Sequence, residues 1–103
     1  MTPEGKVKAQ VKQRLKAHGA YYQMPVTGGY GKGGCSDFLV CYRGYFVSIE
    51  CKADATKPLS ALQQREASAV GAASGYFLRI HKDNLQELDS LLDLLFIRSV
   101  NGR

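Results

Sequence analysis

Cysteine pairs and long apolar segments are both missing from this sequence of 103 residues. Cys35, Cys41 and Cys51 are odd in number and lack CxxC spacing, which argues against a disulfide framework or a structural zinc site. We expect most of these thiols to be buried in strands. No apolar segment approaches the roughly 18 residues of a membrane span, and residues 1–6 lack the apolar part of a signal peptide. The expected location is the cytoplasm, by default of a bacterial or phage-infected cell.

Acidic residues are scarce in the first half of the sequence. Residues 1–52 contain eight lysines and arginines but only three acids, whereas residues 53–103 contain six of each. The net charge of +5 therefore lies entirely in the first half. Such a distribution indicates a surface that faces a polyanion, with a solvated basic helix as the alternative. The acids of the basic half are Glu4, Asp37 and Glu50.

The size and composition indicate a single domain over residues 1–103. A chain of 11.3 kDa buries roughly two-thirds of its surface on folding, enough for one modest core. With 45% apolar and 22% charged residues, it is an ordinary globular sequence rather than a disordered one. This leaves no room for a separate substrate domain.

Apolar periodicity and capping residues predict an α/β fold in the order α-β-β-β-α-β-α. Thr2, Ser60 and Asn84 are the expected helix N-caps. The predicted elements are a helix over 3–17, strands over 21–26, 35–42 and 45–52, a helix over 61–73, a strand over 76–80 and a helix over 84–96. A strand, a crossover helix and a further strand imply a parallel pair joined to an antiparallel hairpin, hence a mixed sheet flanked by helices.

A glycine-rich segment over residues 28–34 separates the first two strands. It is not a phosphate-binding P-loop, because Lys32 is followed by Gly33 rather than by serine or threonine. A flexible loop is the plain interpretation. Alternatively, a loop with few side chains could bring Lys32 and Tyr30 close to a sugar-phosphate backbone.

The hairpin predicts a pair of opposed carboxylates. If Arg43-Gly44 is a two-residue loop, Asp37 lies directly opposite Glu50, and Lys52 shares their face of the sheet. Like charges in that position destabilise a sheet unless a cation compensates, either Lys52 or a divalent metal. A plain surface ion pair is the alternative, and a loop of different parity would separate the two carboxylates.

Carboxylate oxygens suit Mg²⁺ or Mn²⁺. Such a metal polarises a phosphoryl oxygen and lowers the pKa of bound water. A lysine beside it could orient that water or stabilise the negative charge that develops on the oxygens of the phosphorane.

Three short motifs carry a family resemblance. Gly34-Cys35-Ser36-Asp37, Glu50-Cys51-Lys52 and Leu59-Ser60-Ala61-Leu62-Gln63 together resemble the PD-(D/E)XK nuclease superfamily, and most closely its VRR-NUC (virus-type replication-repair nuclease) branch. Ser36 stands where the family motif has proline, and the neighbouring Gln64 leaves open which glutamine is meant.

The resemblance implies a restriction-endonuclease-like sheet and a role for each matching residue. Asp37 and Glu50 would bind the metal, with the backbone carbonyl of Cys51 and with Glu4 from the first helix. Lys52 would position the attacking water, and Gln63 would hold Lys52 or that water. Asp37, Glu50, Lys52 and Gln63 are thus the candidate catalytic residues. A dipole-complementing acid is the alternative for Glu4, and a polar contact at the helix start is the alternative for Gln63.

The resemblance further implies a structure-specific DNA endonuclease that uses Mg²⁺ or Mn²⁺ and acts on branched DNA such as Holliday junctions. Symmetric cleavage of a junction needs two active sites, hence a homodimer. The candidate interface is on the last helix, at Leu91, Leu92, Leu95, Phe96 and Ile97, with the alternative that this helix simply covers the core. The candidate DNA contacts are Lys6, Lys8, Lys12, Lys32 and Arg43. The alternatives are a non-catalytic basic nucleic-acid-binding module and a restriction-type duplex endonuclease.

Overall fold

The fold was obtained as a computed structural model that describes residues 1–26 and 35–102. The glycine-rich segment and Lys32 lie outside the described residues. The elements are α1 (Pro3–His18), β1 (Tyr21–Gln23), β2 (Phe38–Tyr42), β3 (Tyr45–Cys51), α2 (Ala61–Ala72), β4 (Tyr76–Ile80) and α3 (Gln86–Val100). This is the predicted order of helices and strands.

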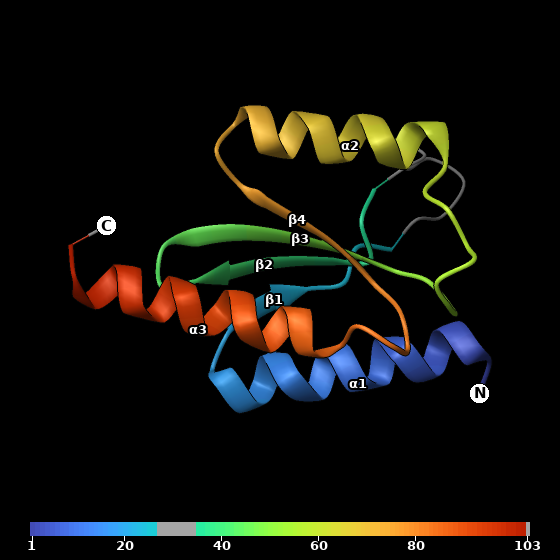
Figure 1. The fold of residues 1–103 in the computed structure, drawn as a ribbon, viewed down its shortest axis with the longest axis horizontal. Coiled ribbons are helices and arrows are strands. Elements are labelled where there is room, and N and C mark those ends of the chain that lie inside the picture. The colour runs from blue at the N-terminus through green and yellow to red at the C-terminus, as the bar shows by residue number, and fades with distance from the viewer. Residues whose placement is uncertain (27–34, 103) are drawn as a thin grey trace.

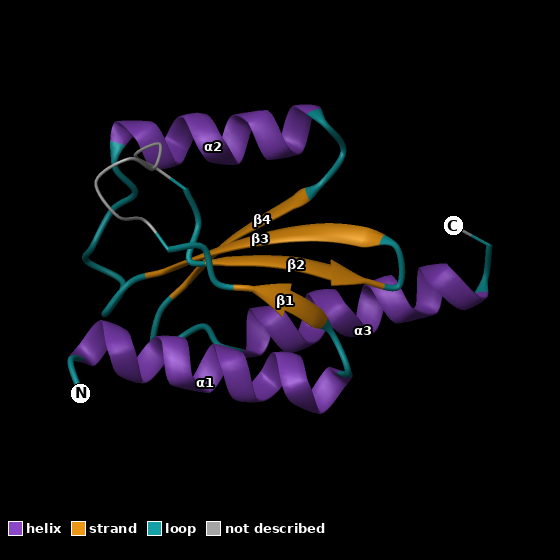
Figure 2. Ribbon diagram, turned by 180° about the vertical axis from the view of Figure 1, so that it is seen from behind, coloured by secondary structure: helices purple, strands orange, loops and turns teal. Residues whose placement is uncertain are grey.

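A four-stranded mixed sheet forms the middle layer, in the order β1-β2-β3-β4. Strand β2 pairs antiparallel with both β1 and β3, and β4 runs parallel to β3 after the crossover through α2. Helix α2 lies over one face of the sheet, and α1 and α3 lie over the other (Figures 1 and 2). The predicted mixed sheet flanked by helices is confirmed.

The main core lies between the sheet and the α1–α3 layer. Alternate strand residues point into it, so that one face of the β2–β3 hairpin is fully apolar. The helices contribute residues at helical spacing, as the sequence predicted. The fully buried core residues include Val11, Leu15, Phe38, Ile49, Ile80, Leu88, Leu92 and Leu95.

Local signals set most of the helix ends. The Thr2 hydroxyl accepts a hydrogen bond from the Gly5 amide at 2.9 Å, and Gly19 ends α1 with a φ of +74°. Ser60 caps α2 as predicted, within a full capping box whose other member is Gln63.

The predicted cap of the last helix is wrong. The Asn84 side chain accepts from the His81 amide at 2.7 Å and donates to the Arg79 carbonyl at 2.9 Å, so it closes the turn between β4 and α3. Helix α3 begins at Gln86 and continues to Val100, beyond the predicted end at Phe96.

Two further expectations need correction. The first strand covers only Tyr21–Gln23, since Pro25 cannot donate to a ladder. Of the three thiols, only Cys51 is buried, while Cys41 is exposed and Cys35 half-buried. Cys41 points to the face that α2 covers, but α2 packs against β4 rather than over β2.

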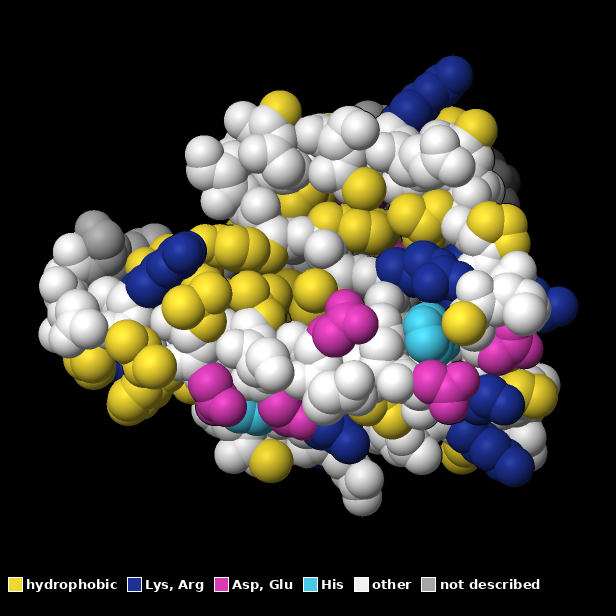
Figure 3. All heavy atoms as spheres, in the orientation of Figure 1, with side chains coloured by type: hydrophobic (Ala, Val, Ile, Leu, Met, Phe, Trp, Pro, Cys, Tyr) yellow, Lys and Arg dark blue, Asp and Glu magenta, His cyan; other side chains and the backbone are white. Residues whose placement is uncertain are grey.

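The C-terminal part of α3 carries apolar residues at the surface. Leu92 and Leu95 are fully buried in the core, so these two cannot form the predicted interface, whereas Leu91 is half-buried against the core. Figure 3 shows hydrophobic side chains gathered over the end of α3 and the adjacent sheet. The exposed members on α3 are Leu94, Phe96, Ile97 and Val100. Among the described residues, no helix has the length and apolar character to span a membrane.

Candidate active site

The register of the β2–β3 hairpin brings two acids together. Tyr42 pairs with Tyr45 and Phe38 pairs with Ile49, so the loop has two residues, as predicted. Arg43 and Gly44 both have positive φ, at 51° and 86°, which is the signature of a type I′ turn. Continuing this register by one residue sets Asp37 opposite Glu50, at the end of the hairpin away from the turn.

Asp37 is held by two donors from different elements. Its Oδ2 accepts a hydrogen bond from the backbone amide of Cys51 at 2.8 Å. Its Oδ1 lies 3.4 Å from Nζ of Lys8, on α1. The carboxylate is thereby fixed at the boundary between the sheet and the first helix.

Glu50 is a buried acid with one free oxygen. The residue is only 5% exposed. Its Oε2 accepts a hydrogen bond from Nε2 of Gln63 at 2.9 Å, whereas its buried Oε1 has no hydrogen-bond partner among the described residues. Burial, followed by the charge of Asp37, raises the pKa of Glu50 to about 7, against the opposing effect of Lys52.

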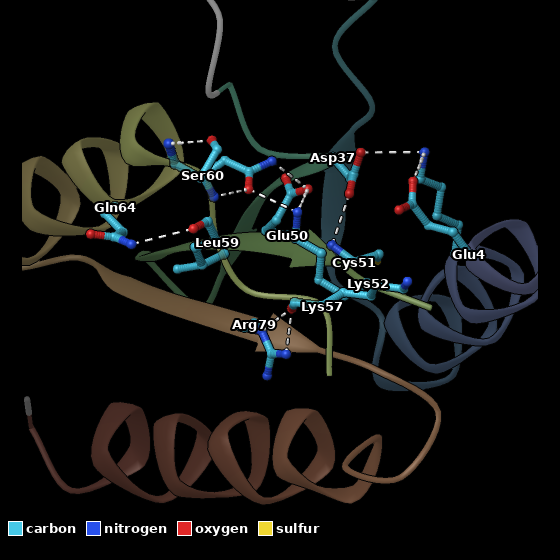
Figure 4. Close-up of polar contacts among 12 residues, drawn as sticks. Glu4, Asp37, Glu50, Cys51, Lys52, Lys57, Leu59, Ser60, Gln64 and Arg79 are labelled. Atoms are coloured by element: carbon cyan, nitrogen blue, oxygen red, sulfur yellow. Dashed lines mark hydrogen bonds and ion pairs between the residues drawn. The ribbon is translucent and has the colours of Figure 1, made fainter. Parts of the chain in front are cut away.

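Lys52 completes a short polar network. Its Nζ donates to Oε1 of Gln63 at 2.8 Å and lies 3.9 Å from Oε2 of Glu50. The side chain is 14% exposed, so water reaches it only in part. Figure 4 shows Glu50, Lys52 and the start of α2 converging at this end of the sheet.

Gln63 serves both the helix and the site. Its Oε1 accepts a hydrogen bond from the Ser60 amide at 2.9 Å at the helix start, and a second one from Nζ of Lys52. Gln64 instead donates to the Leu59 carbonyl at 3.2 Å and points away from Glu50 (Figure 4). The structure therefore brings Gln63, not Gln64, to the predicted catalytic residues.

Glu4 lies at the edge of the cluster, with a lysine beside it. Its Oε2 is 3.4 Å from Nζ of Lys8, the same ammonium that contacts Asp37 (Figure 4). Burial lowers the pKa of Lys8, but the two carboxylates outweigh it and raise that pKa above its ordinary value. Within the described part of the chain, no three acids, histidines or cysteines are already gathered closely enough to hold a metal ion.

The donor set nevertheless fits a divalent metal. Asp37 and Glu50 offer the hard oxygen ligands that Mg²⁺ and Mn²⁺ prefer. The unpartnered, buried Oε1 of Glu50 lacks the hydrogen bond that a buried polar atom normally makes, and a cation would satisfy it.

The candidate DNA-binding residues fall into separate regions. Lys8 belongs to the site, and Lys12 is exposed on α1. Lys6 lines a hollow of about 260 Å³ whose other walls are Pro3, Val7, Gln10, Ala53 and Lys82. Arg43 lies at the opposite end of the hairpin, where it stacks 4.6 Å above the ring of Phe96 and hydrogen-bonds Ser99. It is not brought near Asp37 and Glu50.

Sequence reasoning missed two contacts beneath and beside the site. Lys8 was predicted as a DNA contact, and only the packing of α1 reveals its pairing with Asp37. Ser36, at the position of the motif proline, is 1% exposed and hydrogen-bonded to the Ser48 hydroxyl. The signal available for this second contact was Ser48 itself, a small polar residue between Val47 and Ile49 in the strand.

Comparison with known proteins identifies the fold. No protein-family model matches the sequence. No curated protein matches it either. A solved structure described as a "VRR_NUC domain" is similar to this chain with a TM-score of 0.74, at 24% sequence identity, and the match covers 90% of this chain and 97% of that one. The chain therefore has the fold of a VRR-NUC domain.

Proposed function

We propose that this chain is a metal-dependent endonuclease that hydrolyses phosphodiester bonds in DNA, with branched DNA as its substrate. The observation that carries the proposal is the cluster at the end of the hairpin. There, two opposed carboxylates, one with an unpartnered buried oxygen, lie beside a lysine that a glutamine holds in place. The likeness in fold to a VRR_NUC domain agrees with the same chemistry.

Asp37 and Glu50 would hold the metal, with the Cys51 backbone carbonyl as a third ligand. Cys51 contacts Asp37 through its backbone amide, whereas its side chain is buried in the core. Only the backbone of Cys51 would therefore take part in the site. When bound, Mg²⁺ or Mn²⁺ supplies Lewis-acid activation of the phosphoryl group and of the attacking water. Glu4 is the candidate for a further, more exposed contact.

Lys52 would orient the attacking water and stabilise negative charge on the phosphoryl oxygens. Its ammonium is mostly shielded from solvent, where such a charge acts more strongly than in bulk water. Gln63 restricts Lys52 by accepting a hydrogen bond from its ammonium, and at the same time it donates a hydrogen bond to Glu50 from its amide nitrogen. Both groups are therefore positioned before substrate arrives.

Recognition of branched DNA by a homodimer is the finer part of the proposal. A chain of 103 residues with a +5 charge favours contacts to the backbone and to DNA shape over the reading of base sequence. Two copies related by a two-fold axis would present one cluster to each of two opposed strands. The exposed apolar residues at the end of α3 are the candidate dimer surface.

The test is cleavage of labelled DNA by the wild type in Mg²⁺, Mn²⁺ or EDTA, with a four-way junction, a flap and a plain duplex as substrates. We expect junction cleavage that needs metal. We expect Lys52→Ala and Asp37→Asn each to lower the rate at least 100-fold, a loss typical of removing a charge-stabilising group. Lys57→Ala is the matched control, because its backbone carbonyl, not its side chain, makes the contact with Arg79.

The outcomes separate the proposal from its competitors. Cleavage that survives EDTA, or full activity in Lys52→Ala, contradicts the nuclease assignment. Binding without cleavage in either metal favours a basic nucleic-acid-binding module. Preference for plain duplex over junctions keeps the chemistry but replaces the branched substrate with a duplex one.

A further inference from the structure

Lys8 occupies the place between two carboxylates that a metal site would use. Its Nζ is 3.4 Å from Oε2 of Glu4 and 3.4 Å from Oδ1 of Asp37. Glu4 and Lys8 are one turn apart on α1, whereas Asp37 comes from the start of β2. Lys8 is thus the residue that links the first helix electrostatically to the acidic end of the hairpin.

We propose that the Lys8 ammonium is a resident counter-cation that competes with the divalent metal for Glu4 and Asp37, and that it must leave them before both can bind that metal. This inference rests on the proposed function, because it assumes that these carboxylates are ligands. The ammonium carries the positive charge that a metal would otherwise supply to the pair.

Distance and charge make the two cations mutually exclusive. Mg²⁺ holds its oxygen ligands at about 2.1 Å, so two carboxylates that share it approach more closely than an intervening ammonium allows. A lysine left beside a divalent ion would also be repelled by it. The Lys8 side chain is 34% exposed, which gives it an open path to solvent.

The arrangement explains why the acids are not gathered around one point. Lys8 contacts both Glu4 and Asp37, while Glu50 has an unpartnered oxygen that is buried. Glu50 has Lys52 as its own cation at 3.9 Å. Each side of the cluster therefore has a separate lysine, and only Lys52 is fixed by a glutamine.

The experiment is calorimetric titration of Mn²⁺, without DNA, into the wild type, Lys8→Met and Lys16→Met. Methionine keeps the apolar stem and the helix propensity of lysine while removing its charge. Because partly exposed ion pairs are weak, loss of two of them is expected to tighten the Mn²⁺ Kd by about three- to tenfold. Lys16→Met removes the same charge from the far end of α1 and should leave the Kd within about twofold.

Lys8→Gln is a second variant that removes the same charge, in case Lys8→Met does not fold. Circular dichroism shows whether each variant is folded. Unchanged or weaker Mn²⁺ binding in both folded variants overturns the competition, as does an equal gain in Lys16→Met. If the wild type binds Mn²⁺ and Asp37→Asn weakens that binding while Lys8→Met does not tighten it, only this inference fails. Absence of Mn²⁺ binding in every form overturns both the inference and the metal centre.

Discussion

At the scale of single residues, Glu50 is a buried acid whose surroundings disfavour its charged form. It is a carboxyl group buried at the end of the hairpin, outside the apolar core and close to a second carboxylate. Its partners satisfy one oxygen and leave the other without a hydrogen bond. Such an arrangement costs stability in the absence of a cation, and proteins accept that cost mainly where function requires it.

The raised pKa of Glu50 predicts how stability changes with pH when no metal is present. The folded protein holds the proton up to about pH 7, whereas the unfolded chain releases it near the ordinary value of 4.5. The folded state therefore binds more protons between these values, and the free energy of unfolding falls as the pH rises from about 4.5 to 7. At roughly 1.4 kcal/mol for each pKa unit, the loss amounts to about 3 kcal/mol at most.

Urea unfolding in EDTA from pH 4.5 to 8.5 measures this dependence. We expect Glu50→Gln to remove most of it and to be the more stable protein at pH 8, because the amide carries no buried charge. Asp93→Asn, an exposed change on α3, should keep the wild-type profile. A stability that rises over the same pH range in the wild type would contradict the assigned direction.

At the scale of elements, the hairpin could be predicted because its two-residue loop fixes the register. Once Tyr42 faces Tyr45, the period of two decides that Asp37, Glu50 and Lys52 share a face. Packing between elements distant in sequence leaves no such pattern. The contact of Lys8 with Asp37 depends on how α1 lies on the sheet. The Asn84 side chain does not cap a helix, because its amide group hydrogen-bonds the backbone of the turn that precedes α3.

Helix α2 links the stability of an element to the site through one glutamine. Gln63→Ala removes half of the capping box and also the contacts to Lys52 and Glu50. We expect a loss of about 1 kcal/mol in unfolding free energy together with a large fall in cleavage rate. Ser60→Ala should cost similar stability through the same cap, but with a much smaller effect on cleavage.

Paired unfolding and cleavage measurements on these two variants, with Gln64→Ala as the control, test the distinction. Gln64 makes a backbone contact outside the cluster, so its loss should leave the cleavage rate close to wild type. Equal cleavage rates in Ser60→Ala and Gln63→Ala would mean that Gln63 acts only by capping the helix.

At the scale of the whole molecule, the two ends of the β2–β3 hairpin have different surroundings. One end carries the acidic cluster with Lys8 and Lys52. The turn at the other end packs Arg43 against Phe96, next to the exposed apolar side chains of α3. By the strand rise of about 3.3 Å per residue, Arg43 is roughly 20 Å from Asp37. A second copy bound at the α3 end would therefore leave the acidic end open to DNA.

This geometry gives a prediction about assembly. Sedimentation analysis of the wild type at micromolar concentration should give twice the chain mass of 11.3 kDa. Ile97→Glu places a charge on the 53%-exposed apolar position and should yield monomers, because burying an unpaired carboxylate in an interface is costly. Leu62→Glu makes the same kind of change at a 47%-exposed position on α2 and should leave the dimer intact.

The same variant separates assembly from chemistry. An Ile97→Glu monomer retains the Asp37–Glu50–Lys52 cluster, which lies at the other end of the hairpin, so it should still nick DNA in the presence of metal. Paired, symmetric cuts in a four-way junction should be lost, because they need two linked sites. A wild type that sediments as a single chain yet still makes paired cuts would contradict the dimer, and would require that one cluster acts twice on the same junction.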